Sequence, residues 1–426
     1  MEKLAIFFLA LLLPAAAAPA GTLLLRGATV HTVSHGTLTP GDVLVRNGKI
    51  AAVAPKIDEP ADASIDLAGL HLFPGLISAS TDLGLVEISS VRGSIDSRET
   101  GQFTPEIESW TAVNPDSELI PVSRANGITH FVPVPKGELV AGASGLMAAR
   151  GWTVEDMTVR PRTAMHLFWP DHSLTVPGPK ASKKTKPLDE QARERAERVR
   201  SIDQFFADAE AWDKRPPGSP VVPAWQAMLP VVRGELPLVV HAQGIREIRA
   251  ALKWSATRPR LRLIIEGGRD AWMLATELAQ RKIPVIYSEV FSLPGQSSDA
   301  YDVQFRAPSI LQKAGVTVAI TESSGESASN QRNLPYSAAQ AAAFGLSRDA
   351  ALAAITLIPA QLHGAGDSLG SIEVGKEASL FAATGHILDI RSEVRRLWIS
   401  GAEQSLASRH SRLAERYRTR PAPPQK

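Results

Sequence analysis

Residues 73–84 read Phe-Pro-Gly-Leu-Ile-Ser-Ala-Ser-Thr-Asp-Leu-Gly, an apolar run that passes into small and polar residues. This run completes a candidate strand over residues 70–79, and Ser80 and Asp82 follow at its carboxyl end. A carboxylate binds hard or borderline cations, whereas a serine hydroxyl is a weak ligand because it is not ionised near neutral pH. The alternative is that Asp82 caps the turn at Leu83-Gly84 and that Ser80 fills space.

Five further apolar runs of strand length alternate with helical patterns downstream: 128–134, 236–241, 261–266, 283–288 and 316–321. This alternation is typical of βα units that build a parallel sheet. Two more strands are expected between Val140 and Phe168, and eight strands with helices outside close a barrel. We therefore predict an α/β fold with a (β/α)8 barrel over residues 71–370, in which side chains at the carboxyl ends of strands converge on one mouth.

The 73–84 segment resembles the first barrel strand of the amidohydrolase superfamily, where Pro-Gly-Leu-Ile-Asp is followed by His-x-His-Leu. Ser80 and Asp82 stand where that family has its two histidines. Four other blocks resemble exported, imidazolonepropionase-like members of the superfamily: 114–117, 124–129, 151–157 and 332–336. The resemblance implies further site residues at strand ends: a lysine or glutamate in mid-barrel, histidines on the fifth and sixth strands, and an aspartate on the eighth.

Two of these later positions keep a side chain that can bind a metal. The run 236–242 places His241 where the family keeps the histidine of the fifth strand, the alternative being a hydrogen-bonded structural histidine. The run 316–323 places Glu322 where the family has its aspartate, which touches the metal and takes the proton from the attacking water. Glu322 can do either, although its extra methylene moves the carboxylate by about one C–C bond. The alternative for Glu322 is a solvated acid in the following loop.

The sixth strand lacks its histidine. Residues 263–268 resemble the family's Ile-Glu-His-Gly, with Gly267 in the histidine position. Glu266 is one residue away, and side chains alternate between the two faces of a strand. We therefore expect Glu266 to point to the other face and to serve a structural role behind the site.

Asp82, His241 and Glu322 form the candidate metal set. One histidine and two carboxylates can hold at most one divalent cation, zinc or similar, with waters completing the shell. We expect Glu322 to act as general base and His241 as ligand or electrophile. The candidate binding residues around this set are Ser80, Arg332 and Asn333. The alternative is that Arg332 and Asn333 are helix-capping and loop residues.

Two functions from different classes follow. The first is a hydrolase of C–N bonds other than peptide bonds, with a reduced, at most mononuclear, metal site and a small-molecule substrate. The alternative is a catalytically inactive protein that keeps the fold and binds a ligand or partner, because a fold by itself does not guarantee a function. Metal-free acid/base catalysis by paired carboxylates is a third hypothesis, and it requires a dry pocket that drives their pKa values apart.

The two ends of the chain, residues 21–70 and 371–405, are predicted to form one β-sandwich. Asn47-Gly48 between two alternating runs is a strong hairpin signal. Residues 370–380 resemble the Gly-x-Ile/Leu-x-x-Gly-Lys-x-Ala-Asp-Leu segment that amidohydrolases place after the barrel, with Ser379 replacing the aspartate. In that family both chain ends pair beside the barrel. Two unrelated terminal strands, the alternative, would leave unpaired edges.

Residues 1–20 combine a lysine, an apolar run of about ten residues and an A-x-A-like end, as in a secretory signal peptide. We expect cleavage after Ala20 and a periplasmic or secreted protein, the alternatives being an uncleaved anchor or a buried helix. No other stretch is long and apolar enough to cross a membrane, so we expect no stable membrane insertion after cleavage. The chain contains no cysteine, which excludes disulfides and thiolate metal ligands.

The charge of the chain is balanced, with 46 basic and 44 acidic residues, so no large field would draw it to nucleic acid. Residues 178–215 interleave acids and bases and predict an exposed, charged helical insertion, a basic partner patch being the alternative. Residues 406–426 predict a C-terminal helix and a disordered tail. The sequence does not decide between a monomer and an oligomer.

Overall fold

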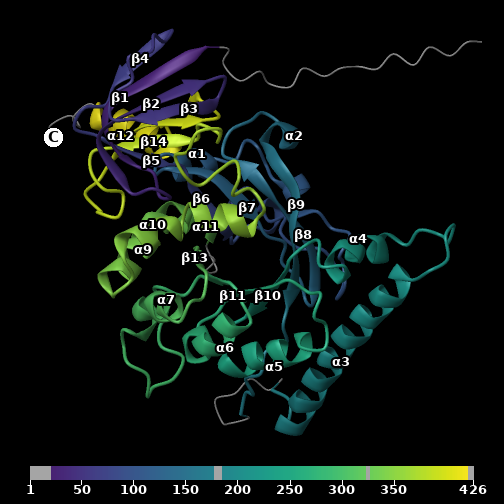
Figure 1. Ribbon diagram of the computed structural model, residues 1–426. Helices are drawn as coiled ribbons and strands as arrows, with labels where there is room; N and C mark the ends of the chain where they lie inside the picture. Colours follow the sequence, from purple (N-terminus) through teal and green to yellow (C-terminus); the bar gives the residue numbers. More distant parts are fainter. Residues whose placement is uncertain (1–20, 177–184, 323–326, 421–426) are drawn as a thin grey trace, which may run out of the picture.

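The computed structural model describes residues 21–176, 185–322 and 327–420 and contains two eight-stranded sheets (Figure 1). The expected signal peptide, residues 1–20, lies outside the described residues, as do residues 421–426 of the expected tail. The strands of the first sheet are β1 (Thr22–His31), β2 (Thr37–Arg46), β3 (Lys49–Ala54), β4 (Ala63–Asp66), β5 (His71–Pro74), β14 (Leu380–Ala383), β15 (Val394–Ile399) and β16 (Ala402–Glu403). The strands of the second are β6 (Leu76–Thr81), β7 (Ile128–Pro133), β8 (Val140–Ala148), β9 (Thr158–Phe168), β10 (Leu238–Ala242), β11 (Leu263–Gly267), β12 (Val285–Tyr287) and β13 (Val318–Ile320).

The helices lie mainly between and after the barrel strands (Figure 1). They are α1 (Leu119–Arg124), α2 (Val154–Met157), α3 (Leu188–Asp213), α4 (Pro223–Val232), α5 (Ile245–Ser255), α6 (Ala275–Gln280), α7 (Val303–Lys313), α8 (Ser327–Asn330), α9 (Leu334–Ala343), α10 (Arg348–Ala353), α11 (Leu357–Leu362) and α12 (Arg409–Arg418). Across the described ranges, none of them has the length and hydropathy that crossing a bilayer requires.

The second sheet is the predicted barrel, with its strands in the order β6 to β13. The strands are parallel except for β8, which runs antiparallel to both β7 and β9. We expected a parallel sheet throughout. A parallel connection needs a dozen or more residues, and the link 134–139 between β7 and β8 is too short for one. The barrel and the sheet beside it confirm the predicted fold class.

Residues 354 and 355 lie at the seam between the first and last barrel strands. Ile77 of β6 donates its amide to the carbonyl of Ile355 (2.9 Å), and Ile320 of β13 donates to that of Ala354 (2.9 Å). These bonds satisfy backbone groups that would otherwise be left at two sheet edges. The barrel is therefore nearly closed.

The inside of the barrel is filled by one side chain from each of six strands. This interior cluster consists of Ala79, Ala164, Val239, Ile264, Ile286 and Ala319, with Ile358 and Leu362 of α11 packed against it. Because side chains alternate along a strand, the residue two positions further on also points into the barrel, and it lies nearer the mouth at the carboxyl ends of the strands. On β9, β10 and β11 these residues are His166, His241 and Glu266.

The first sheet joins the two ends of the chain, as predicted. β5 pairs with β1 on one side and with β14 on the other, so the purple and yellow segments of Figure 1 lie side by side. The expected hairpin is formed by β2 and β3, where Asn47 (φ 50°) and Gly48 (φ 76°) supply the two positive φ angles of a tight turn.

The charged insertion contains a long helix, α3, as predicted. Arg193 and Glu197 form an i,i+4 ion pair on this helix (3.9 Å). We expected few apolar residues there to face a core, and the second half of α3 corrects this expectation. It buries Ile202, Phe205, Phe206 and Ala209.

Gly75, which separates β5 from β6, lies where a side chain has no room. A Cβ at this position would lie 1.9 Å from Oγ1 and 2.5 Å from Cγ2 of the buried Thr129. We expect Gly75→Ala to lower the free energy of unfolding by about 3 kcal/mol, because overpacking of a buried site typically costs about 1–3 kcal/mol or more. Urea unfolding measures the change.

Gly93→Ala is the matched control, because nothing lies within 4 Å of its added Cβ. We expect it to change the unfolding free energy by less than about 0.5 kcal/mol. Equal stabilities of the two variants would contradict the close packing of Gly75 against Thr129.

Candidate active site

A cavity of about 550 Å³ opens at the carboxyl ends of β6, β7, β9, β10 and β11. This is the end of a βα barrel where ligands bind, and the volume suits a small molecule. Its polar lining includes Ser80, Asp82, Lys136, His241, Glu266 and Arg269. Phe168 stacks on the His241 ring, with ring centroids 4.0 Å apart, and forms part of an apolar wall.

His241 and Glu266 line this cavity, and a second imidazole, that of the buried His166, lies directly behind them. Ligand atoms of His166, His241 and Glu266 all lie within 4.8 Å of one another. The Nδ1 atom of His166 is 2.9 Å from Nε2 of His241, so the two rings share one hydrogen, and Nδ1 of His241 is 3.7 Å from Oε1 of Glu266. Glu266 Oε2 is buried and has no hydrogen-bond partner among the described residues.

Burial sets the protonation states of this cluster. It lowers the pKa of His241 to about 3 and the pKa of His166 well below its usual value, so both rings are neutral at pH 7. Burial raises the pKa of Glu266 to about 8, helped by the nearby charge of Asp82 and opposed by the hydrogen bond from Ser80. Neutral imidazoles are the form that binds a metal.

The donor set fits a divalent cation. Two imidazole nitrogens and one carboxylate oxygen are the ligands of many catalytic zinc sites, with bond lengths near roughly 2.0–2.2 Å. Such bond lengths place ligand atoms of one ion about 3–4 Å apart, and small side-chain movements reach this from the present spacing. A cation would also give the unpartnered Glu266 Oε2 a partner.

Asp82 and Ser80, both predicted from the sequence, line the cavity. Asp82 is buried and forms an ion pair through Oδ2 with Lys136, which lies beyond β7. Ser80 donates a hydrogen bond to Oε1 of Glu266. Asp82 and His241 are therefore brought to one cavity, as the predicted metal set requires.

Glu322 is not among the residues that line this cavity within the described ranges. Its neighbour Thr321 donates to the Ser80 carbonyl (2.7 Å), whereas Glu322 lies beyond the end of β13 and is not among the clustered ligand atoms of the described residues. Its carboxylate accepts a hydrogen bond from Ser337 of α9, and burial raises its pKa. The structure does not bring the three predicted ligands together.

Arg332 and Asn333 lie in a 3₁₀ turn before α9 and also do not line the cavity within the described part of the chain. The Arg332 carbonyl accepts a hydrogen bond from the side chain of Asn126. Asn333 occupies the N-cap position of α9, but its side chain makes no capping bond. This placement agrees with the loop alternative rather than with a pocket rim.

Sequence reasoning missed two residues of the cluster. His166 stands in the run Thr-Ala-Met-His-Leu-Phe, 163–168, and the available signal was a histidine two positions after a small inward residue. Glu266 was expected on the other face, and the structure corrects this, because Ile264 lies inside the barrel and Glu266 follows the same alternation. The position of the missing histidine, Gly267, is covered by Gln243, whose Nε2 would lie 2.5 Å from an added Cβ.

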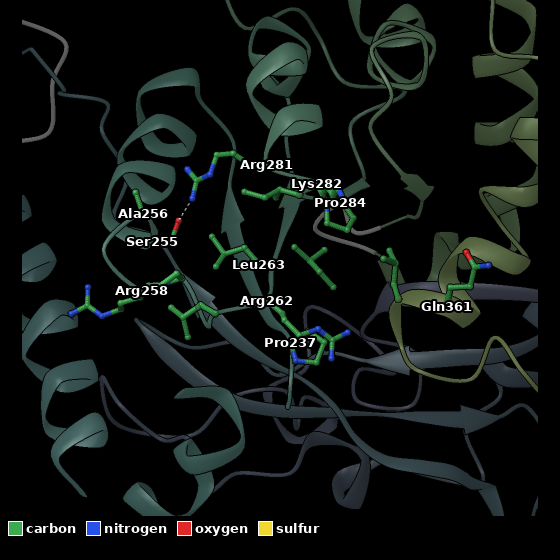
Figure 2. A pocket seen from close by; sticks show the side chains of 15 residues that line it. Pro237, Ser255, Ala256, Arg258, Arg262, Leu263, Arg281, Lys282, Pro284 and Gln361 are labelled. Carbon is green, nitrogen blue, oxygen red and sulfur yellow. Dashed lines mark hydrogen bonds between the residues drawn. The ribbon is translucent and has the colours of Figure 1, made fainter. Parts of the chain in front are cut away.

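A second cavity, of about 660 Å³, lies at the opposite end of the barrel, at the loops that precede β10, β11 and β12 (Figure 2). Its fifteen lining residues include Arg258, Arg262, Arg281 and Lys282 and contain no imidazole or carboxylate. Arg281 is held by Ser255 (2.9 Å) and the Leu252 carbonyl (2.7 Å). Of these two cavities, the first is the one lined by an imidazole and carboxylates.

The raised pKa of Glu266 predicts how the stability of metal-free protein depends on pH. The folded state holds this proton up to about pH 8, whereas an unfolded glutamate releases it near pH 4.5. The stabilisation is complete below about pH 4.5 and is lost as the pH rises to about 8, by up to about 1.4 kcal/mol per pH unit. Glu266→Gln removes this titration. Urea unfolding in EDTA from pH 5 to 8 should show a steeper decline for wild type, and parallel curves would contradict the assignment.

Comparison with known proteins gives matches along most of the chain. Residues 270–403 match the amidohydrolase family. The chain is 23% identical over 398 residues to amidohydrolase tasK of Hapsidospora irregularis, covering 85% of this chain and 40% of that protein. The chain thus spans less than half the length of this curated relative.

Solved structures also resemble this chain. An amidohydrolase from Thermotoga maritima MSB8 superposes with a TM-score of 0.78 at 25% identity, covering 89% of this chain and 99% of that one. An adenosine deaminase from Xanthomonas campestris, solved with bound zinc, gives a TM-score of 0.53 at 19% identity, covering 93% and 97% of the two chains. The second likeness concerns the fold alone.

Proposed function

We propose, from matches that support a place in the amidohydrolase superfamily, that this chain is a hydrolase with one divalent cation held by His166, His241 and Glu266. The observation that carries this proposal is a cluster of two neutral imidazoles and a carboxylate, of which His241 and Glu266 line a cavity of about 550 Å³ and His166 lies behind them. This set replaces the predicted set of Asp82, His241 and Glu322. It keeps His241 and has His166 and Glu266 in place of Asp82 and Glu322.

The proposed reaction is hydrolysis of a C–N bond other than a peptide bond in a small molecule, such as a cyclic amide or an acylated amino acid. A divalent cation supplies Lewis acidity, which polarises a carbonyl group and makes water a stronger nucleophile. Asp82 then acts as the general base, because it is a carboxylate at the mouth beside the cluster. The ammonium group of Lys136, paired with Asp82, supplies positive charge beside the oxygen that becomes negative.

Arg269 and the apolar Phe168 and Trp169 line the same cavity and suit a substrate with an anionic group and an apolar part. An anion would pair with the Arg269 guanidinium, which is about one-third exposed. The aromatic walls would exclude water from the reacting group.

The test is metal analysis of the purified full chain, combined with turnover of a panel of cyclic amides and acylated amino acids. We expect one divalent cation per chain and turnover that is lost on chelation and restored by the metal. Absence of both a bound cation and turnover in metal-supplemented buffer would reject the proposal and leave the ligand-binding alternative.

A further inference from the structure

A chain of buried polar side chains leads away from the cavity through the barrel interior. His241 contacts His166, as described above, and Nε2 of His166 lies 2.8 Å from the Oγ of Ser144 on β8. His166 and Ser144 are both fully buried. Each polar hydrogen along this series of side chains must therefore have its acceptor within the protein.

The series of hydrogen-bonded side chains continues from Ser144 to a backbone carbonyl on the other side of the barrel. The Oγ atom of Ser144 is 3.4 Å from Oγ1 of Thr163, which is 3.1 Å from Nδ1 of His363. The Nε2 atom of His363 lies 3.0 Å from the carbonyl oxygen of Ala79. Thr163 and His363 are also buried, so the whole path is shielded from water.

The carbonyl end fixes the direction of the hydrogen bonds. A carbonyl oxygen can only accept, so Nε2 of His363 carries the hydrogen that bonds to Ala79. Burial lowers the pKa of His363 to about 4, so the ring is neutral and its Nδ1 must accept. Thr163 lies within reach of two acceptors, this Nδ1 (3.1 Å) and the backbone carbonyl of Ser144 (3.2 Å). It donates its hydroxyl hydrogen to Nδ1, because Thr163 is the hydrogen-bond partner that the described residues give this nitrogen.

The direction of the remaining hydrogen bonds, from Thr163 back to His166, follows in the same way. Because the Thr163 hydrogen is used, its oxygen accepts from Ser144, and the Ser144 oxygen accepts from Nε2 of His166. The Nδ1 atom of His166 is left with its lone pair facing His241. If Ser144 instead donates its hydrogen to Nε2 of His166, neither hydroxyl has a hydrogen left for the other, and the bond between Ser144 and Thr163 is lost. A buried hydrogen bond contributes roughly 0.5–1.5 kcal/mol, and this one, at 3.4 Å, lies at the low end of that range. The arrangement in which His166 donates from Nε2 is therefore preferred.

We propose that Ser144, Thr163 and His363 are positioning residues that hold His166 in its Nε2–H tautomer, with the Nδ1 lone pair turned to the cation site. The tautomer itself follows from the hydrogen-bond path and the neutral His363 ring, and its role in cation binding rests on the proposed function. Partners that hold the second ring nitrogen of a metal-binding histidine fix its tautomer and orientation in just this way.

Thr163→Val tests the proposal, because it removes the hydroxyl and keeps the branched shape. Long-range ¹H–¹⁵N NMR of the histidine-labelled full chain in EDTA reports which ring nitrogen carries the hydrogen, and His166→Asn identifies the His166 signals. We expect wild-type His166 to be protonated on Nε2, and Thr163→Val to shift the population toward Nδ1–H. We also expect Zn²⁺ affinity to fall about 10–100-fold in this variant.

Three further variants sharpen the test. Thr163→Ser keeps the hydroxyl and should restore both readouts, whereas Thr158→Val, on the same strand but outside the path, should change neither. Ser144→Ala removes the acceptor of His166 directly and serves if Thr163→Val does not fold. Protonation of wild-type His166 on Nδ1, or an unchanged tautomer in both Thr163→Val and Ser144→Ala, would overturn the proposal. Absence of Zn²⁺ binding with the expected tautomer shifts would instead contradict only the proposed function.

Discussion

His166→Ala and His241→Ala are each expected to lower the affinity of the protein for Zn²⁺ by about 10³-fold or more. Structural zinc sites with four ligands bind with roughly 10–16 kcal/mol, so each ligand contributes several kcal/mol. Isothermal titration of the chelated, dialysed protein with Zn²⁺ measures the loss. Turnover should fall with the affinity.

Two controls accompany the histidine variants. His410→Ala removes an exposed histidine on α12 and should leave the affinity unchanged. Thermal unfolding of each variant in EDTA separates loss of a ligand from loss of the fold, since His166 is buried and hydrogen-bonded on both ring nitrogens. A folded His166→Ala variant with wild-type affinity would remove His166 from the cation site.

Asp82→Asn is expected to lower kcat by about 10²–10⁴-fold while the bound metal remains at one ion per chain. An amide cannot accept the proton of the attacking water, whereas it keeps the size of the carboxylate. The combination of lost turnover and retained metal distinguishes a base from a ligand, the role that the sequence first suggested for Asp82. Steady-state kinetics and metal analysis of the same preparation provide both readouts.

Asp171→Asn is the matched control for Asp82→Asn, because Asp171 lines the same cavity and contacts Ser173 (2.6 Å) rather than Lys136. We expect its kcat to remain close to that of wild type. Loss of metal from Asp82→Asn would return Asp82 to the ligand set, and unchanged kcat would exclude it as the base.

The fold could be predicted because its signals are local or repeated. Asn47-Gly48 specifies a hairpin by its backbone preference alone, and the barrel strands recur as separate apolar runs. The antiparallel direction of β8 escaped prediction because it depends on the short link 134–139, whose boundaries appear only once the strands are paired.

Only part of the site was predicted, because a motif gives a position along the chain but not the face of a strand. His241 was found because it ends an apolar run at the expected place. Glu266 was assigned to the wrong face, since a shift of one residue reverses a side chain, and Glu322 lies past the end of its strand, where the motif gives no direction. Only packing inside the barrel, where Ile264 and Ala319 point inward, decides between neighbours.

The placement of β5 between β1 and β14 makes completion of the first sheet depend on a segment that is synthesised about 300 residues after β5. While a ribosome is still adding residues before β14, one edge of β5 has no partner, and β5 leads through Gly75 directly into the strand that carries Ser80. A nascent or truncated chain would therefore expose a strand edge with unpaired backbone N–H and C=O groups and be a substrate for chaperones and proteases. Loss of β14, β15 and β16 should thus abolish accumulation of the protein, even though every residue that lines the 550 Å³ cavity precedes β14.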